Sequence, residues 1–572
     1  MCGIVGYVGK SVKIKKILAR LQNLEYRGYD SSGVAFFGKN LETHKVVGTI
    51  DKLFDKIGEK ESGLCISHTR WATHGKVSER NAHPQISYNG NFAVVHNGII
   101  ENYKSLKEQI GVEKFSSETD TEVLANLLEQ ESGNTLEKLK SATKKLVGSW
   151  ALLVVDKCGD AIYASKNKSP LYASETESGY LLASDITCFD KGDYYCFEDG
   201  MIAKIQKDKI EFFLNGKMVF PAKFANNSEF GANSKGEFDY FMQKEIKETP
   251  KVLKNLCKTY EKLIADSQFL SIFDNAGRVL LCGCGTAYHA CALGARWIAK
   301  TKNLRTIAGF SSEIRYFGNI EKTDVVILVS QSGETADTLA VLEKAKSVKA
   351  KVVAITNCSH STLARCSDVV LPLCAGAEIA VASTKAYSAM LAVMHILSSE
   401  NPQEAIKEVE FLADNLVCEI DLSLVKQISF VKRIFFIGRG DDGITASEGA
   451  LKLKETSYLD SYGYFAGELK HGTIALIEPN VTVVAIVTNK QIESKTLNAV
   501  EECLSRGARA VIVSEQKPQI DAKFVQINPK IAENLKSIAA IFPLQWLAAS
   551  VADYRGCNPD RPRNLAKSVT VE

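Results

Sequence analysis

A cysteine stands second in the chain, in the run Met1-Cys2-Gly3, where removal of the first methionine would leave it with a free α-amine. An α-amine has an unperturbed pKa of roughly 7.7–8.0, so part of it is unprotonated near neutral pH. Such an amine can act as general base for the thiol of the same residue and make Cys2 a nucleophile. The alternative is a small apolar residue at the start of a buried strand, and Cys2 alone leaves both interpretations open.

A cysteine nucleophile needs hydrogen-bond donors for an oxyanion and a clamp for a charged substrate. Asn97 and Gly98 follow the apolar run Phe92–His96, and an Asn amide and a Gly N–H can face one developing oxyanion. The same pair also fits a hairpin turn. Arg70 follows another apolar run and suits a carboxylate. Asp120 opens a helical stretch, where it suits either helix capping or binding of an ammonium group.

In the second half of the chain, an apolar run is followed by a hydroxyl-rich glycine loop, Ser330-Gln-Ser-Gly-Glu-Thr335, and then by a helical pattern. Hydroxyls and backbone N–H groups at a helix N-terminus favour an anion. The loop lacks the Gly-Lys-Ser/Thr ending of a nucleotide P-loop. The sequence therefore predicts a phosphate site without a nucleotide, whereas ordinary helix capping would use only one hydroxyl. Thr286 and Ser383 lie in similar strand-end or helix-start positions.

Candidates for acid–base chemistry lie further on. Glu448, Lys452 and Glu455 share one face of a predicted helix, which also fits an ion-pair stripe on the surface. His471 stands beside a glycine in a loop-like setting. The final segment adds two cations, Arg563 and Lys567. Three other histidines lack such surroundings and are interpreted as structural or surface residues: His289, His360 and His395.

The composition excludes several classes of protein. A chain of 572 residues predicts two to four domains, and its net charge of +3 indicates neither a nucleic-acid nor a membrane partner. The nine histidines form no metal-like cluster, and Cys282-x-Cys284 lacks a second pair at zinc-site spacing. No metal or other cofactor is expected. Without a signal-peptide pattern, and with reduced thiols, we expect a cytoplasmic protein.

The elements that position these residues change in character along the chain. Up to about residue 220, short apolar strands separated by turns predict an α+β fold of layered, mostly antiparallel sheets with helices. Afterwards, helices alternate with continuous apolar strands, which predicts α/β domains with mostly parallel, doubly wound sheets. Three apolar runs recur 155 to 158 positions later, which indicates two copies of one unit. The expected divisions are 1–221, a linker at 222–238, the two copies at 239–405 and 406–552, and a tail at 553–572.

Five motifs of the first half occur in the order found in a known family: Cys2-Gly-Ile-Val-Gly, Tyr26-Arg-Gly-Tyr-Asp-Ser31, His68-Thr-Arg-Trp-Ala-Thr-His-Gly75, His96-Asn-Gly98 and Glu118-Thr-Asp120. Together they resemble the glutaminase domain of class II, N-terminal-nucleophile amidotransferases. The resemblance implies that glutamine acylates Cys2 and that Asn97 and Gly98 form the oxyanion hole. It also implies roles for further residues: Arg70, Thr73, His74 and Asp120 in glutamine binding, Arg27 in orienting the N-terminus, and Trp71 in gating ammonia release.

The second half resembles a duplicated sugar-isomerase (SIS) domain. In combination, the halves resemble the isomerising glutamine–fructose-6-phosphate aminotransferases, whose substrates are glutamine and fructose 6-phosphate. For this chain the resemblance implies a set of sugar-phosphate ligands: Thr286, Ser330, Gln331, Ser332, Thr335 and Ser383. It further implies proton transfer between C1 and C2 by Glu455, an imine on Lys567, and supporting roles for Glu448, Lys452 and Arg563. His471 would assist ring opening from the neighbouring subunit of a homodimer.

Two residues depart from the pattern of this family. Ala287 replaces a serine and Thr473 replaces a proline, and we expect both to tune affinity. A long insertion of eukaryotic relatives is absent, which favours a bacterial-type enzyme without feedback by a nucleotide sugar. A sugar-phosphate-sensing regulator with a vestigial hydrolase is the alternative, but it predicts loss of the acid–base residues.

Overall fold

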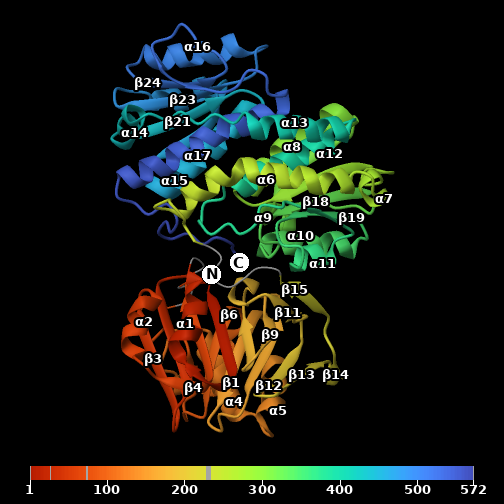
Figure 1. Ribbon diagram of the computed structural model, residues 1–572, viewed down its shortest axis with the longest axis vertical. Coiled ribbons are helices and arrows are strands. Elements are labelled where there is room, and N and C mark those ends of the chain that lie inside the picture. The colour runs from red at the N-terminus through yellow and green to blue at the C-terminus, as the bar shows by residue number, and fades with distance from the viewer. Residues whose placement is uncertain (1, 26–27, 72–74, 227–233, 571–572) are drawn as a thin grey trace. The chain divides into compact units, whose positions relative to one another are not determined.

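The computed structural model describes residues 2–25, 28–71, 75–226 and 234–570. The chain forms two compact units, Met1–Ser234 with Ser568–Glu572, and Lys235–Lys567 (Figure 1). Each unit has hydrophobic clusters of its own. We call them the first unit and the SIS unit, and describe each by itself.

The first unit contains two sheets whose strand pairs are antiparallel. In spatial order, the larger sheet contains β15 (Lys223–Asn226), β11 (Gly192–Cys196), β9 (Tyr172–Thr176), β10 (Gly179–Ala183), β1 (Gly3–Lys13), β4 (Glu61–Arg70), β2 (Ser31–Phe37) and β3 (Leu41–Val47). The smaller sheet contains β14 (Lys217–Val219), β13 (Lys209–Leu214), β12 (Ile202–Gln206), β8 (Ile162–Asn167), β7 (Gly148–Asp156), β6 (Phe92–Ile100) and β5 (Gln85–Ile86).

Alternating side chains bind the layers of the first unit together. On β1, Ile4 joins the cluster between the two sheets, whereas the next residue, Val5, faces helices on the outside. This period of two is what an extended strand with both faces covered requires. The outer faces are covered by α1 (Ile14–Gln22) and α2 (Ile50–Ile57) on the larger sheet, and by α3 (Tyr103–Ile110), α4 (Thr121–Gln130) and α5 (Thr135–Thr143) on the smaller. The expected layered α+β fold is confirmed.

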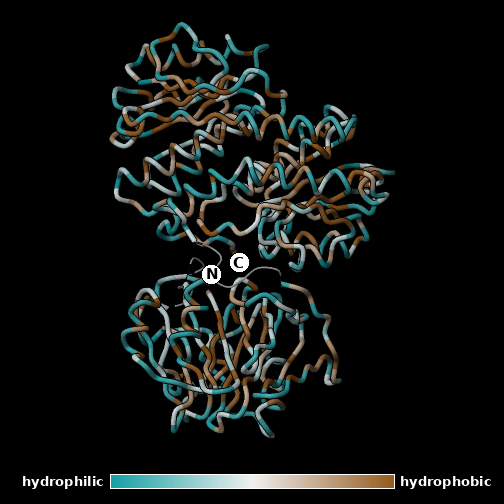
Figure 2. Tube along the Cα trace, viewed as in Figure 1, coloured by the Kyte–Doolittle hydropathy of each residue, from teal (hydrophilic) through white to brown (hydrophobic). Residues whose placement is uncertain are grey.

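The SIS unit contains two five-stranded parallel sheets with the same strand order. The first contains β17 (Thr306–Phe310), β16 (Arg278–Gly283), β18 (Asp324–Ser330), β19 (Lys351–Thr356) and β20 (Val369–Pro372). The second contains β22 (Ser461–Phe465), β21 (Arg433–Gly438), β23 (Val481–Val487), β24 (Arg509–Ser514) and β25 (Lys523–Gln526). The central strands β18 and β23 are buried along their whole length, and Figure 2 shows such strands as hydrophobic stretches. The duplication and the parallel sheets are therefore confirmed.

The helices of the SIS unit fall into an inner and an outer set. The inner set lies between the two sheets (Figure 1) and shares one hydrophobic cluster with both: α6 (Phe241–Leu263), α8 (Thr286–Lys302), α12 (Lys385–Ser398), α13 (Pro402–Asp414), α14 (Leu422–Ser429), α15 (Asp441–Ser457) and α17 (Lys536–Tyr554). The others are α7 (Ser267–Leu270), α9 (Ser311–Phe317), α10 (Ala336–Ser347), α11 (Thr362–Cys366) and α16 (Glu493–Leu504). The shared cluster makes the two copies one folded body.

Two elements of the fold differ from the sequence-based prediction. Strand β6 runs to Ile100, so Asn97 and Gly98 lie inside a strand opposite Ala151 and Trp150, and the hairpin alternative is wrong. Part of the expected linker, Lys223–Asn226, pairs with β11 because an edge strand needs hydrogen bonds on one side only.

One stretch of the described chain, Glu533–Tyr554, is long and apolar enough to cross a membrane. However, 89% of its most apolar window is buried inside the structure. Such burial is typical of a core helix.

Candidate functional site

Three strands meet at Cys2, which immediately precedes β1. The backbone N–H of Trp71, just after β4, donates to the Cys2 Sγ atom at 3.3 Å. From β6, the Asn97 Nδ2 group donates to the backbone carbonyl of Cys2 at 2.9 Å. Burial raises the pKa of the Cys2 thiol, although the Trp71 N–H and the Arg70 guanidinium act in the opposite direction. The thiol is therefore mostly protonated near neutral pH and needs a base before it can attack.

Gly98 occupies a position that only glycine can fill. Its φ is +139°, and an added Cβ atom would lie 2.0 Å from the carbonyl oxygen of Ser149. Beneath this strand, the His68 Nε2–H donates to the His96 carbonyl at 3.0 Å. Burial lowers the pKa of His68 to about 3, so its imidazole is neutral and acts as a fixed donor. These contacts hold the backbone of β6 next to Cys2.

Arg70 and Asp120 are both buried near the thiol, and their charges act on it. Arg70 ends β4. Asp120 stands at the N-cap position of α4, but its side chain does not cap the helix and instead accepts the Ile100 N–H at 2.8 Å. The capping interpretation is therefore wrong. Three further predicted residues lie outside the described residues: Arg27, Thr73 and His74.

In the SIS unit, the hydroxyl-rich loop connects β18 to α10, as predicted. The Ser330 hydroxyl accepts the Gly333 N–H at 3.1 Å and lies 2.9 Å from the Thr335 hydroxyl. Ser332 accepts the Glu334 N–H at 3.2 Å, and the Gln331 carbonyl accepts the Asn357 N–H at 3.1 Å. The loop is thus held by its own hydroxyls at the N-terminus of α10, where an anion is favoured.

The predicted helical face of α15 is buried, so the surface-stripe interpretation is wrong. Glu448 is 0% and Lys452 1% exposed. The Lys452 Nζ atom lies 2.7 Å from Glu455 Oε2, 3.0 Å from the Thr286 hydroxyl and 3.5 Å from Glu448 Oε1. Burial alone would lower the pKa of Lys452, but the carboxylates of Glu455 and Glu448 outweigh it and raise the pKa. Lys452 is therefore a fixed cation between two carboxylates.

His289 belongs to this cluster, so its interpretation as a structural or surface residue is wrong. Its Nδ1 atom lies 2.6 Å from Glu448 Oε2. Burial alone would raise the pKa of Glu448, but Lys452 and His289 outweigh burial and lower it. The sequence held one indication of this role: His289 follows Thr286 by three positions in the same helix, which places both residues on one face. His395 instead pairs with Glu408 at 2.7 Å, away from the predicted site residues.

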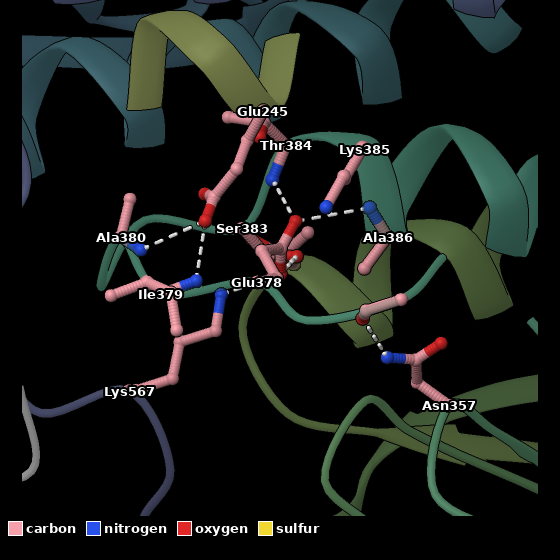
Figure 3. A network of polar contacts seen from close by, with 12 residues as sticks. Glu245, Asn357, Glu378, Ile379, Ala380, Ser383, Thr384, Lys385, Ala386 and Lys567 are labelled. Atoms are coloured by element: carbon pink, nitrogen blue, oxygen red, sulfur yellow. Dashed lines mark hydrogen bonds and ion pairs between the residues drawn. The ribbon is translucent and has the colours of Figure 1, made fainter. Parts of the chain in front are cut away.

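Lys567 is held by the carboxylate of Glu378, a residue that no sequence pattern singled out. Its Nζ atom donates to Glu378 Oε2 at 2.5 Å, and the Ser383 hydroxyl donates to the same oxygen at 3.1 Å (Figure 3). The hydroxyl of Ser383 is therefore bonded to Glu378. No composition signal marks Glu378, because its role depends on a partner 189 positions away.

Arg563 and His471 lie apart from these groups in the contacts of the described residues. The Arg563 N–H donates to the Tyr458 hydroxyl at 2.7 Å, and its guanidinium lies 4.2 Å from the centre of the Tyr458 ring. His471 ends the short 3-10 helix η4 (Glu468–His471) and is exposed.

The first unit has two antiparallel sheets enclosed by helices and a thiol at the end of one strand, as in a glutamine amidotransferase domain. The SIS unit is a duplicated parallel α/β body. Together they define a glutamine amidotransferase fused to SIS domains. Comparison with known families agrees, since residues 68–191 match the glutamine amidotransferase domain and residues 272–399 and 427–551 each match the SIS domain.

Comparison with individual proteins gives the family. Two proteins named glutamine–fructose-6-phosphate aminotransferase [isomerizing], from Clostridium tetani and Caldanaerobacter subterraneus, are each 39% identical to this chain, with 100% of both chains covered. A solved C-terminal domain of glucosamine-fructose-6-phosphate aminotransferase from Francisella tularensis is 30% identical, with a TM-score of 0.53, and covers 58% of this chain and 100% of that one. The chain belongs to the family of isomerising glutamine–fructose-6-phosphate aminotransferases.

Proposed function

We propose that this chain converts fructose 6-phosphate and glutamine to glucosamine 6-phosphate and glutamate. The observation that carries this proposal is the buried cluster around Lys452. There, charged groups suited to acid–base chemistry, Lys452 and Glu455 of the second SIS copy, lie beside Thr286 of the first SIS copy. A sugar-phosphate-sensing regulator has no need for such a costly buried charge. Membership of the family over the whole chain supports the same activity.

In the first half-reaction, Cys2 attacks the side-chain amide of glutamine. Because the thiol is mostly protonated, its own α-amine acts as the base. Asn97 and Gly98 donate to the oxyanion, and loss of such a donor costs roughly 3–4 kcal/mol of transition-state stabilisation. Ammonia leaves, and water then hydrolyses the thioester to glutamate. The α-carboxylate and α-amine of glutamine are bound by a set of residues: Arg70, Thr73, His74 and Asp120, with Arg27 orienting the N-terminus.

Ammonia then reaches the second site without equilibrating with bulk water. We assign the gate for ammonia release to Trp71. Its backbone N–H donates to the nucleophilic sulfur, so a movement of Trp71 would change the surroundings of Cys2.

In the second half-reaction, the phosphate of the sugar binds the hydroxyl-rich loop and its neighbours: Thr286, Ser330, Gln331, Ser332, Thr335 and Ser383. Lys567 forms an imine with the open-chain ketose. Ammonia replaces it at C2, and Glu455 moves a proton between C1 and C2 to give the amino aldose. Acid–base assistance of this kind contributes roughly 10²–10⁴-fold. Glu448, Lys452 and Arg563 support the site electrostatically.

The direct test is formation of glucosamine 6-phosphate from glutamine and fructose 6-phosphate by wild type and by Cys2→Ala. We expect the variant to lose glutamine-dependent synthesis and to keep synthesis from ammonium salts, because only the first half-reaction uses the thiol. If wild type makes no product, the proposed reaction is wrong. If Cys2→Ala still uses glutamine, the nucleophile is wrong.

We further propose a homodimer in which His471 completes the sugar site of the partner subunit. This proposal is supported by the exposure of His471 and by the lack of a hydrogen bond or ion pair between it and the Lys452 cluster within the described residues. Inactive His471→Ala and Lys567→Ala proteins, mixed under dissociating conditions, should regain about a quarter of wild-type activity, because half of the dimers then contain one intact site. No regain after verified subunit exchange would contradict shared sites. We place the enzyme in the cytoplasm, where its fifteen free cysteines stay reduced.

A further inference from the structure

Two buried carboxyl groups lie behind Lys567, and no role has yet been given to one of them. Glu378 lies between β20 and α12, and Glu245 lies on α6. They are only 5% and 2% exposed. Figure 3 shows both carboxyl groups and the Lys567 amino group gathered at the segment Glu378–Ala386, which we call the carboxyl strap.

Glu378 has the surroundings of an ionised carboxylate. Its Oε1 atom accepts the backbone N–H groups of Thr384 at 2.9 Å and Ala386 at 3.0 Å, and its Oε2 atom accepts from Ser383 and Lys567. Burial alone would raise the pKa of Glu378, but Lys567 and these donors outweigh burial and lower it. Four donors, one of them a cation, therefore hold the negative charge in place.

Glu245 has a different environment. Its Oε1 atom accepts the backbone N–H groups of Ile379 and Ala380, so it fixes the first residues of the carboxyl strap. Its Oε2 atom is buried and has no hydrogen-bond partner within the described part of the chain. Burial first, and the charge of Glu378 second, raise the pKa of Glu245 to about 8.

Two cations also act on Glu245, Lys567 and Lys385. Neither is available to it as a close partner, because Lys567 donates to Glu378 and Lys385 pairs with Glu248 at 2.7 Å. Near neutral pH, Glu245 thus keeps its proton while Glu378 is ionised, as expected for two interacting carboxyls.

We propose that Glu245 is a positioning residue for Lys567: it holds the carboxyl strap through two backbone N–H groups while staying uncharged, so that a single negative charge faces the Lys567 amino group. The inference rests on the proposed imine at Lys567. It adds a residue and a charge state that this imine requires.

The chemistry explains why one charge suits the site better than two. The Lys567 ammonium first loses one proton to water, and the amine nitrogen then bonds to the carbonyl carbon of the ketose. The carbonyl oxygen leaves as water with the two remaining amine protons, and the imine nitrogen can then take up a proton from water while Glu378 stays ionised. An ionised Glu245 would add a second negative charge near the Lys567 amino group, favour the ammonium over the neutral amine and so oppose this loss of a proton.

The test is borohydride trapping of the imine between fructose 6-phosphate and Lys567 in the full-length protein, read by mass spectrometry of the peptide that contains Lys567. Wild type and Glu245→Gln, which keeps the acceptor oxygen but cannot ionise, are compared at each pH from 6.5 to 9.5. We expect the wild-type to Glu245→Gln ratio to be close to one at pH 6.5 and to fall several-fold above pH 8. Glu261→Gln, an exposed site on the same helix, should keep the wild-type profile.

A ratio that does not change with pH would overturn the inference for Glu245 while leaving the imine intact. No adduct in wild type at any pH would instead overturn the imine at Lys567, and the two failures are therefore distinguishable. Glu245→Leu removes the acceptor as well, and we expect it to trap little adduct at every pH. If folded Glu245→Leu, checked by circular dichroism, traps as wild type does, the carboxyl strap does not need Glu245.

Discussion

The ammonium of Lys452 lies between two carboxylates at a depth where an unpaired charge is costly. Glu448 has no exposed surface, so its charge is balanced only by side chains around it. Two of these, Thr286 and His289, come from the first SIS copy, and Lys452 comes from the second. The chemistry of single residues here therefore depends on both copies.

Lys452→Met should strongly destabilise the SIS unit. The substitution keeps the length of the side chain but removes one charged partner of a buried ion pair and leaves Glu448 with His289 and Thr286 alone, and loss of one partner of such a pair costs about 3–5 kcal/mol. Lys407→Met, in an exposed pair with Glu404 at 3.4 Å, should cost less than about 1 kcal/mol. Urea unfolding of both variants measures the difference, and equal losses would show that burial does not set the cost.

His289→Ala should slow sugar amination about tenfold or more, since a hydrogen bond to a buried charge contributes roughly 1.5–3 kcal/mol. The expected loss lies in kcat for glucosamine 6-phosphate, and glutamine hydrolysis by the same preparation serves as the internal reference. His395→Ala, which removes the contact with Glu408, is the matched control. A similar loss in both variants would argue against a role for the His289–Glu448 pair.

At the scale of elements, the loop between β18 and α10 was predictable from the sequence, whereas the burial of the charged cluster on α15 was not. Ser330, Ser332 and Thr335 are close in sequence, so a strand, a glycine loop and a helix are enough to place them. The cluster on α15 was ambiguous because spacing gives a helical face but not what covers it. The covering residues lie about 160 positions earlier, on α8.

Gly333→Ala should disrupt the phosphate loop. The φ of Gly333 is +65°, and an added Cβ atom would lie 2.0 Å from the Ser361 hydroxyl. We expect KM for fructose 6-phosphate to rise at least tenfold while glutamine hydrolysis is kept.

Gly376→Ala is the control for Gly333→Ala. Its φ is +64°, but none of the described residues has an atom within 4 Å of an added Cβ atom, so only backbone strain of about 1 kcal/mol is added. If Gly376→Ala raises KM equally, crowding at Ser361 is not the cause.

At the scale of the whole molecule, the repeat was visible because buried parallel strands keep continuous apolar runs, and three such runs recur at one spacing. The layered first unit was predictable from its short strands. Two features of the first unit were not predictable. Strand β15 is polar and is paired along one edge only. Strand β6 continues through Asn97-Gly98 because Ser149 and its neighbours on β7 pair with it. Contacts between distant segments decide such cases.

Because each unit has its own hydrophobic clusters, heating should give two calorimetric transitions. Saturating fructose 6-phosphate should raise the transition temperature of the SIS unit alone. A ligand at 100 times its Kd stabilises the folded unit that binds it by about 3 kcal/mol. Gly333→Ala should remove this shift without moving the other transition. A shift of both transitions in wild type would contradict independent units.

The hydrogen bonds from Thr286 and His289 to Glu448 have a consequence for recombination. In laboratory evolution, a crossover between α13 and α14 would join the first SIS copy of one parent to the second copy of another. Every such chimera would combine the α8 of one parent with the Glu448 of the other. Productive offspring should therefore inherit positions 286, 289, 448 and 452 from a single parent, as one linked trait.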